Sequence, residues 1–472
     1  MTETDPALMT AEELGENYAR ARLSPVEALQ AVTERIARHN GRVNAFVLLD
    51  PGAVRAAGES EQRWRAGRPS GPLDGVPVTV KDLLNMAGLP TRRGSRLTSA
   101  EPATEDAPVV SSLRAAGAVI VGKTTTTEFG WKTPGDCPLN GITRNPWDPG
   151  RTTGGSSSGA GAAGAASFGA LHVGTDAGGS VRIPAAWCGL VGLKPTFGRV
   201  PQWPHGAFAG VACAGPMTRT VRDNALMFAA MAQYDSRDPF CWPGDGSPWP
   251  DGAWHRGIEA GVAGLRVGVV GRFGFDAPLD GEGIVAVEDA ARALAEAGAH
   301  VEHATVDLPD MRALFTTVWG VALAKLVDGY TPEQRRLLDA GLLDVAEAER
   351  GATAYDMLES DAQRSLAAHA MARFHRGYDL LLCPTVPAGP VAADAPTADP
   401  IGSLHTAWAP WTFTFNLTRQ PAVTVPLGVG ASGTPRSVQL AAAVHRDDLV
   451  FRAARVLEQA VPTPRAELGA RQ

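Results

Sequence analysis

The chain has 472 residues, of which 43 are Lys or Arg and 50 are Asp or Glu, so its formal charge is −7. This length suits one large α/β domain or two to three ordinary ones, and a hydrophobic fraction of 44% excludes disorder over most of the chain. The mild acidity argues against a nucleic-acid or membrane-surface partner, because both require clustered basic residues.

The first half of the chain begins with a polar, acidic segment. Residues 1–20 contain no apolar stretch of the kind found in signal peptides, so we expect a cytoplasmic protein. Two helices are predicted within residues 10–40. The second begins at Ser24, because Ser24 suits the N-cap, Pro25 the first helical position, and Glu27 closes a capping box.

The rest of the chain alternates between short apolar runs and longer helical patterns. Strands are predicted at 75–80, 118–121, 170–174, 265–270, 380–384 and 422–426. Helices are predicted at 107–116, 159–168, 283–298, 310–376 and 446–460. Loops are predicted at 133–158, at a Gly-rich turn over 175–180, and at a Trp-rich surface excursion over 235–260.

This alternation predicts the α/β class, with one mixed, mostly parallel sheet covered by helices on both faces. No clean linker divides the chain, so residues 1–472 are interpreted as one domain. The segment 159–174 is short and rich in small residues, which favours a buried helix and strand over a membrane span. The cysteines form no CxxC pair and the histidines no HExxH motif, so neither a metal nor another cofactor is expected.

Two short motifs suggest functions that their context argues against. Residues 117–124 match the phosphate-loop pattern, but the variable positions are Ala-Val-Ile-Val, a run typical of a strand whose N–H groups are already paired. Residues 155–159 match the GxSxG elbow of α/β-hydrolases, but a loop precedes them where that elbow needs a strand. The nearest downstream histidine, His172, lies in a buried strand pattern.

Three other segments together suggest amide hydrolysis. They are Lys81 at the end of an apolar strand, the Ser/Gly loop 154–159, and the Gly-rich segment 174–184. A serine hydroxyl needs a base, and lysine can serve if burial brings its pKa, ordinarily about 10.4, near neutrality. Consecutive N–H groups over 177–180, with almost no side chains in the way, could hold an oxyanion.

The sequence here resembles the amidase signature hydrolases over nearly its whole length. The core matches are KD at 81–82, GGSSSGA at 154–160, GTDAGGSVRIPA at 174–185 and CGLVGLKPT at 188–196. Flanking matches are TRNPWD at 143–148, GPMTRTVRD at 215–223, CPT at 383–385 and FNLTRQPAVTVP at 415–426. The resemblance implies the amidase signature fold, with a signature core at about 75–200 and a helical region covering the pocket at about 310–376.

The resemblance also implies roles for individual residues. Ser180 would be the acylated nucleophile, Ser156 the bridging acid/base that follows a cis peptide bond, and Lys81 the general base. The N–H groups expected to form the oxyanion hole belong to Ala177, Gly178, Gly179 and Ser180. Residues expected to have structural roles are Asp176 and Arg182, which would brace the loop, and Ser157 and Ser158, although Ser157 could hydrogen-bond in the site.

The remaining lysines are expected to be structural. Lys123 and Lys194 lie in segments typical of the family and suit packing or ion pairs, whereas Lys132 and Lys325 suit the protein surface. The chain departs from the family pattern at 131–140, 200–214 and 435–440, where relatives build substrate pockets. Aromatic residues in the first two of these segments are the predicted pocket residues: Trp131, Trp203 and Phe208.

The leading interpretation is a stand-alone amidase acting on an amide, aryl amide or carbamate. One alternative is the glutaminase subunit of a tRNA-dependent amidotransferase complex, which would need partner subunits and polar groups for glutamine. Another is a non-catalytic binding protein, which retention of Lys81, Ser156 and Ser180 disfavours. The expected partner is a small-molecule substrate, and the family frequently forms homodimers. The sequence does not distinguish aliphatic amides, aryl amides, carbamates and ureas.

Overall fold

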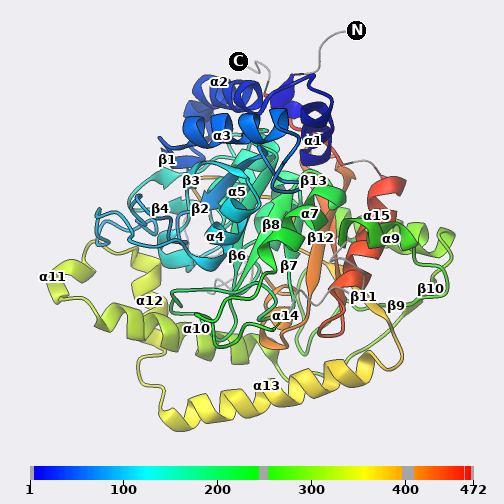
Figure 1. Cartoon of the computed structure of the whole chain (residues 1–472). Coiled ribbons are helices and arrows are strands. Elements are labelled where there is room, and N and C mark those ends of the chain that lie inside the picture. Colours follow the sequence, from blue (N-terminus) through cyan, green and yellow to red (C-terminus); the bar gives the residue numbers. More distant parts are fainter. Residues whose placement is uncertain (1–4, 244–253, 396–408, 462, 469–472) are drawn as a thin grey trace.

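An eleven-stranded sheet runs through the molecule in this computed structural model, which describes residues 5–243, 254–395, 409–461 and 463–468 (Figure 1). The order across the sheet is β1-β3-β2-β6-β8-β7-β12-β13-β11-β9-β10. In that order the strands are β1 (Phe46–Leu49), β3 (Val119–Thr124), β2 (Pro77–Lys81), β6 (Leu171–Asp176), β8 (Cys213–Thr218), β7 (Val191–Lys194), β12 (Ala422–Val429), β13 (Pro435–Ala442), β11 (Leu380–Pro384), β9 (Arg266–Val269) and β10 (His300–His303). A separate two-stranded sheet pairs β4 (Asp136–Cys137) with β5 (Gly141–Ile142).

Helices cover both faces of this sheet. One face packs against α1 (Ala11–Ala19), α4 (Pro108–Ala115), α7 (Val221–Met231), α8 (Trp254–Gly257), α9 (Gly281–Glu296) and α15 (Asp447–Ala460). Helices packed on the other side are α2 (Pro25–Val43), α3 (Ala53–Arg65), α5 (Ser158–Ala165), α6 (Arg182–Cys188), α10 (Met311–Asp328), α12 (Ala340–Ala348), α13 (Ala354–Phe374) and α14 (Phe413–Leu417). Short helical segments complete the described chain: η1 (Pro6–Leu8), η2 (Glu128–Gly130), η4 (Ile258–Ala260) and α11 (Pro332–Arg335).

The prediction of one mixed sheet between helical layers is confirmed. Parallel pairs lie toward its two ends, where β2 joins β3 and β6, and where β9 joins β10 and β11. From β6 to β11 the neighbouring strands pair antiparallel, as does the edge strand β1 with β3. The antiparallel centre has a topological reason, because a hairpin-like connection joins β12 to β13 and a loop without a crossover helix joins β7 to β8.

A local sequence signal accounts for the start of one long helix. Helix α2 begins as predicted: the Ser24 side chain accepts from the Glu27 N–H (3.2 Å), and the Glu27 carboxylate accepts from the Ser24 N–H (2.8 Å).

The predicted helical region 310–376 contains α10 to α13. The predicted excursion 235–260 is described except for 244–253, and Trp254 at its end is buried against Phe228.

The phosphate-loop match is a strand, as its apolar character predicted. Residues 119–124 form β3, where Gly122 is paired with both β1 and β2.

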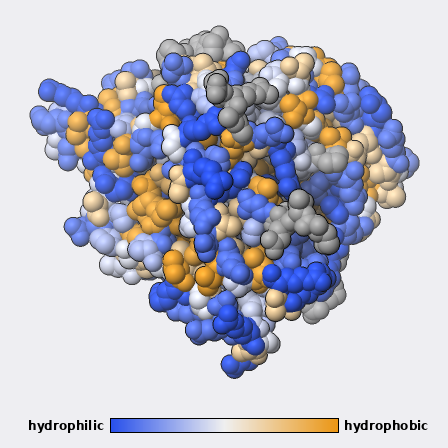
Figure 2. Space-filling model, turned by 90° about the horizontal axis from the view of Figure 1, so that it is seen from above, coloured by the Kyte–Doolittle hydropathy of each residue, from blue (hydrophilic) through white to orange (hydrophobic). Residues whose placement is uncertain are grey.

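None of the described helices has the length and apolar character that a membrane crossing requires. The surface seen from above is mainly hydrophilic, with small hydrophobic groups between the polar side chains (Figure 2).

Candidate active site

Lys81 forms the floor of the candidate site. It ends β2, which runs parallel to β6 with Val80 opposite Val173, so the two strands end at the same edge of the sheet. This geometry brings Thr175 beside Lys81, whose Nζ donates to Thr175 Oγ1 at 2.9 Å. Lys81 is completely buried.

The serine-rich loop closes over this lysine. Lys81 Nζ donates to Ser156 Oγ at 2.7 Å and to Ser157 Oγ at 2.9 Å. The Ser157 hydroxyl in turn donates to the Thr175 carbonyl at 3.2 Å. The peptide bond between Gly155 and Ser156 is cis, as the resemblance implied.

Small residues hold this loop close to the sheet. Helix α5, which follows the serines, is buried along its whole length. A Cβ on Gly159 would collide with the Ala45 carbonyl and the Thr125 N–H, so only glycine allows this close approach. The Gly/Ala composition of α5 therefore positions the serines over Lys81.

Burial holds the pKa of the Lys81 ammonium well below its usual value, and the Asp176 carboxylate opposes this shift only in part. Burial alone would raise the pKa of the Asp176 carboxyl, but Arg182 and Asn416 hold it below its usual range. Arg182 Nε and Nη2 donate to the two Asp176 oxygens, both at 2.9 Å. The surroundings therefore favour the ionised form of Asp176 and the neutral form of Lys81.

The Gly-rich turn presents backbone N–H groups next to Ser180. Within the described chain, no hydrogen bond is found for the N–H of Ala177, Gly178 or Ser180. The N–H of Gly179 instead donates to Asp176 Oδ1 at 2.8 Å, so one of the four N–H groups predicted to hold an oxyanion is already engaged.

Thr412 supports this turn from a distant part of the chain. Its hydroxyl donates to the Gly178 carbonyl at 2.6 Å. Gly179 has φ +130°, and a Cβ there would collide with the Thr412 hydroxyl. Both the backbone conformation and the close contact therefore require glycine at position 179.

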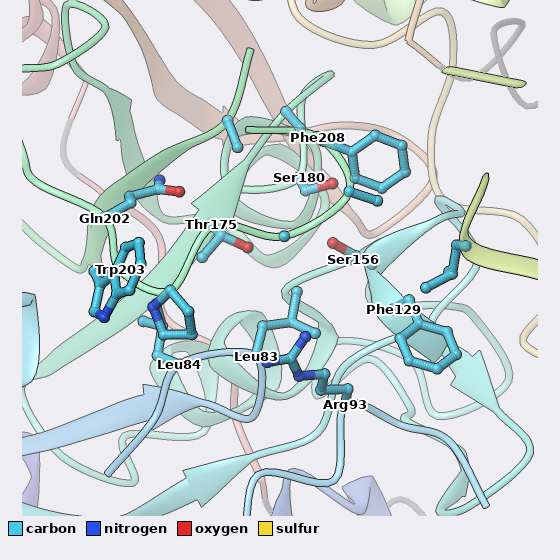
Figure 3. A pocket seen from close by; sticks show the side chains of 17 residues that line it. Leu83, Leu84, Arg93, Phe129, Ser156, Thr175, Ser180, Gln202, Trp203 and Phe208 are labelled. Carbon is cyan, nitrogen blue, oxygen red and sulfur yellow. The ribbon is translucent and has the colours of Figure 1, made fainter. Parts of the chain in front are cut away.

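An apolar pocket of about 790 Å³, including its open mouth, leads to the serines. Figure 3 shows the Ser156 and Ser180 hydroxyls facing the same space, with Trp203 and Phe129 on opposite sides of them. The polar lining residues are Arg93, Ser156, Thr175, Ser180 and Gln202. The apolar and glycine lining residues are Leu83, Leu84, Phe129, Gly130, Ala177, Trp203, Pro204, Gly206, Ala207, Phe208, Ala212 and Leu326.

Two of the three predicted aromatic residues line this pocket. Trp203 is partly exposed at it, and Phe208 stacks on Trp319 with ring centroids 3.7 Å apart. Trp131 does not line the pocket, which corrects the prediction. It is buried instead, with its ring against Gly341 of α12.

Lys123 and Lys194 have the structural roles that were predicted, and Lys325 lies at the surface. Lys123 is buried in an ion pair with Asp82 (2.7 Å), and Lys194 is buried with its Nζ donating to the Pro195 carbonyl (2.7 Å). Lys325 is exposed, as predicted.

The surface position predicted for Lys132 is wrong. This lysine is buried between Asp136 and Asp339, with both N–O distances at 2.7 Å. Asp339 begins α12, so the partner comes from a segment 207 positions away that no local pattern could link to Lys132.

His172, the nearest histidine downstream of the serine-rich loop, is buried and bonded to a residue other than Lys81 or the serines. Burial lowers the pKa of His172 to about 3, and its Nδ1 shares a 2.9 Å hydrogen bond with Thr79. Within the ranges the structure describes, no three His, Cys, Asp or Glu side chains are grouped so as to hold a metal ion.

Several residues of the site were not predicted. Thr175 lies within the Gly-rich signature and beside a strand end, so its contact with Lys81 could have been inferred. Thr412 and Asn416 are more than 200 residues from the turn they support, and no sequence signal links them to it. Arg93 lies in the loop after β2, whose sequence has no helical or strand periodicity that would indicate where its side chain lies.

Comparisons with known proteins agree with this geometry. The sequence model of the amidase family matches residues 27–451. An acylamidase from Rhodococcus erythropolis is 37% identical over 98% of this chain and 97% of its own length. A glutamyl-tRNA(Gln) amidotransferase subunit from Salinispora arenicola is 34% identical over 97% of this chain and 98% of its own length.

Solved structures give the same result. A bacterial aryl acylamidase of the amidase signature family superposes with a TM-score of 0.88 at 27% identity, over 96% of each chain. A 6-aminohexanoate cyclic dimer hydrolase superposes with a TM-score of 0.87 at 30% identity, over 98% of this chain and all of its own. The chain therefore belongs to the amidase family, as an amidase signature hydrolase that acts on amide carbon–nitrogen bonds.

Proposed function

We propose that this protein is a stand-alone acylamidase that cleaves aryl or other apolar amides through an acyl-enzyme on Ser180. The observation that carries the proposal is the 2.7 Å contact between Lys81 Nζ and Ser156 Oγ, buried beneath a pocket that Ser180 also lines. A lysine with a lowered pKa can accept a proton through a neighbouring hydroxyl.

In the acylation step, Ser180 Oγ attacks the substrate carbonyl carbon, and the carbonyl π electrons move onto oxygen. The Ser180 proton passes to Ser156, whose own proton passes to Lys81. When the oxyanion collapses, the carbon–nitrogen bond breaks, and the proton returns from Lys81 through Ser156 to the leaving amine. Water then attacks the ester along the same relay, which releases the acid and restores Ser180.

The oxyanion is assigned to the N–H groups of Ala177, Gly178 and Ser180. Loss of one donor of such a site typically costs about 2.7–4 kcal/mol in the barrier. Asp176 acts by positioning, because its bonds with Arg182 and the Gly179 N–H fix the turn on which Ser180 stands.

The pocket supports an apolar substrate. Trp203 and Phe208 offer flat apolar surface to a substrate ring, and an aryl carbamate would present the same type of carbonyl. The similarity to amidotransferase subunits makes a glutaminase role the second candidate. No Asp or Glu lines the described pocket to receive the glutamine ammonium group, which favours the amidase.

Hydrolysis by the single purified chain tests the proposal. The panel contains a 4-nitroanilide, an aryl carbamate, an aliphatic amide and glutamine, and we expect the highest kcat/KM for the anilide. A higher kcat/KM for glutamine or acetamide would contradict the assigned substrate class.

Labelling tests the assigned nucleophile. A sulfonyl fluoride should modify Ser180, and peptide mapping of the adduct to Ser156 or Ser157 would contradict the assignment. Ser180→Ala should lose most of its turnover while keeping the circular dichroism spectrum of the wild type.

A further inference from the structure

We propose that Arg93 selects substrates that carry a carboxylate on the part of the amide that occupies the Phe129 side of the pocket. The proposal rests on the amidase function above and extends it from the reacting bond to the charge of the substrate. Arg93 would act in specificity rather than in the chemical step, because the hydrogen bonds of Lys81 that form the relay do not include it.

The backbone of Arg93 is held firmly on the pocket wall. Its N–H donates to the Asp82 carbonyl at 3.1 Å, and its carbonyl accepts from the Phe129 N–H at 2.8 Å. Arg93 has φ +51°, and its half-buried side chain lines the pocket. These backbone contacts fix the point from which the Arg93 side chain extends along the pocket wall.

The Arg93 guanidinium has no hydrogen-bond or ion-pair partner among the residues that the structure describes. Two other arginines of low exposure illustrate the contrast, because Arg63 is paired with Asp74 and Arg182 with Asp176. The charge at position 93 is therefore available for a ligand.

In the described structure, the carboxylates that neighbour the Arg93 backbone, those of Asp82 and Glu128, neither line the pocket nor bind the Arg93 guanidinium. No Asp or Glu lines the described part of the pocket. The Asp82 carboxylate is already paired with Lys123 at 2.7 Å. Burial raises the pKa of the Tyr330 phenol, and the positive charge of Arg93 partly offsets this increase. The Arg93 side chain therefore lies near Tyr330, which follows α10.

The shape of the pocket indicates where an anion would lie. Figure 3 shows Arg93 beside Leu83, with Phe129 on the adjacent wall and Trp203 across the serines. A substrate could place its carbonyl at Ser180 and an apolar group toward Trp203, with a carboxylate reaching Arg93. The planar fork of a guanidinium matches a carboxylate with two parallel hydrogen bonds.

Pairs of substrates with carbon skeletons of equal length, one member charged and the other neutral, test this inference. One pair is the 4-nitroanilide of glutaric acid and that of pentanoic acid, and the other is N-acetyl-4-aminobenzoate and N-acetyl-4-aminobenzamide. These pairs place the carboxylate in the acyl part and in the amine part respectively. In at least one pair, we expect the wild type to show a kcat/KM at least tenfold higher for the charged member, mainly through a lower KM.

Arg93→Gln should reduce this ratio at least tenfold, and Arg93→Lys should retain part of it. The matched control is Arg92→Gln, because Arg92 is adjacent in sequence but lies outside the pocket lining and should keep the wild-type ratio. Added salt should lower the ratio in the wild type but not in Arg93→Gln.

A wild type that shows no preference in either pair would overturn the proposal even if the variants failed to fold. An equal ratio in the wild type and Arg93→Gln would also overturn it. Hydrolysis of the neutral anilides would still support the amidase function in either case, so the two conclusions fail separately.

Discussion

At the scale of single residues, the proposed base, Lys81, places the strictest demand on residue type. The chain uses 38 arginines and only five lysines, so a merely cationic position could have been Arg. Lys81 instead lies fully buried against three hydroxyl groups, where burial lowers its pKa. Arginine stays protonated at any working pH and cannot replace it as a base.

Lys81→Arg places a permanently protonated group at this position and should therefore nearly abolish turnover, as measured by kcat/KM for an anilide. The matched control, Lys325→Arg, changes an exposed lysine and should leave kcat/KM unchanged. If Lys81→Arg kept more than about a tenth of the wild-type value, a loss below roughly 1.4 kcal/mol, the lysine would be a structural cation.

The pH dependence follows from the lowered pKa of Lys81. Below that pKa the amine is protonated and cannot accept the Ser156 proton, so kcat/KM should rise as pH increases through it. This rise in kcat/KM should occur well below the pH range in which an ordinary lysine titrates. A kcat/KM that rises only in the pH range in which an ordinary lysine titrates would contradict the lowered pKa of Lys81.

At the scale of elements, the ion cluster around Lys132 joins the segment 128–137 to the start of α12. Lys132 binds Asp136 of β4 and Asp339 at the start of α12, while the Glu128 carboxylate accepts from the Asp339 N–H at 2.7 Å. Removal of one partner from a buried ion pair leaves the other charges uncompensated.

Lys132→Met should lower the free energy of unfolding by about 3 kcal/mol, near the lower end of the usual range, because Asp136 retains some contact with water. Urea denaturation measures this change. Lys325→Met is the control and should denature at the wild-type urea concentration. If both variants had the same midpoint, the Lys132 cluster would contribute little stability.

The elements also show which parts of the fold a sequence can reveal. Strands with continuous apolar runs, such as β2, β3 and β11, were predicted within a few residues. Strand β8 (Cys213–Thr218) contains Gly and Pro, and β13 begins with Pro, so their extended conformation depends on neighbours in the sheet rather than on propensity. Local motifs located Lys81, Ser156 and Ser180, whereas distant supports such as Thr412 and Asp339 became visible only when the chain was folded.

At the scale of the whole molecule, the site lies between a deeply buried sheet and a more exposed helical region. Strands β2, β6 and β11 are almost entirely buried, whereas α11 has no buried residue and α13 exposes Tyr355, Leu358 and Leu366. Segments with few buried contacts open more easily than core strands.

Amide hydrogen exchange should therefore be fastest in α11 and α13 and slowest in the central strands. Mass spectrometry of the exchanged peptides measures this difference in the intact chain. In Lys132→Met, the additional exchange should concentrate at 332–348, which the ion cluster anchors. Equal protection of the helical region and the sheet would contradict this division.

The burial of four of the five lysines has a practical consequence for covalent attachment. Lys81, Lys123, Lys132 and Lys194 are enclosed, and Lys325 is the one lysine side chain that the described structure leaves exposed to solvent. An amine-directed ester should therefore couple to the folded enzyme at Lys325 and at no other lysine. Coupling through lysine would fix every molecule to a support in one orientation by a bond on α10, whereas an enzyme with many surface lysines would be held at random.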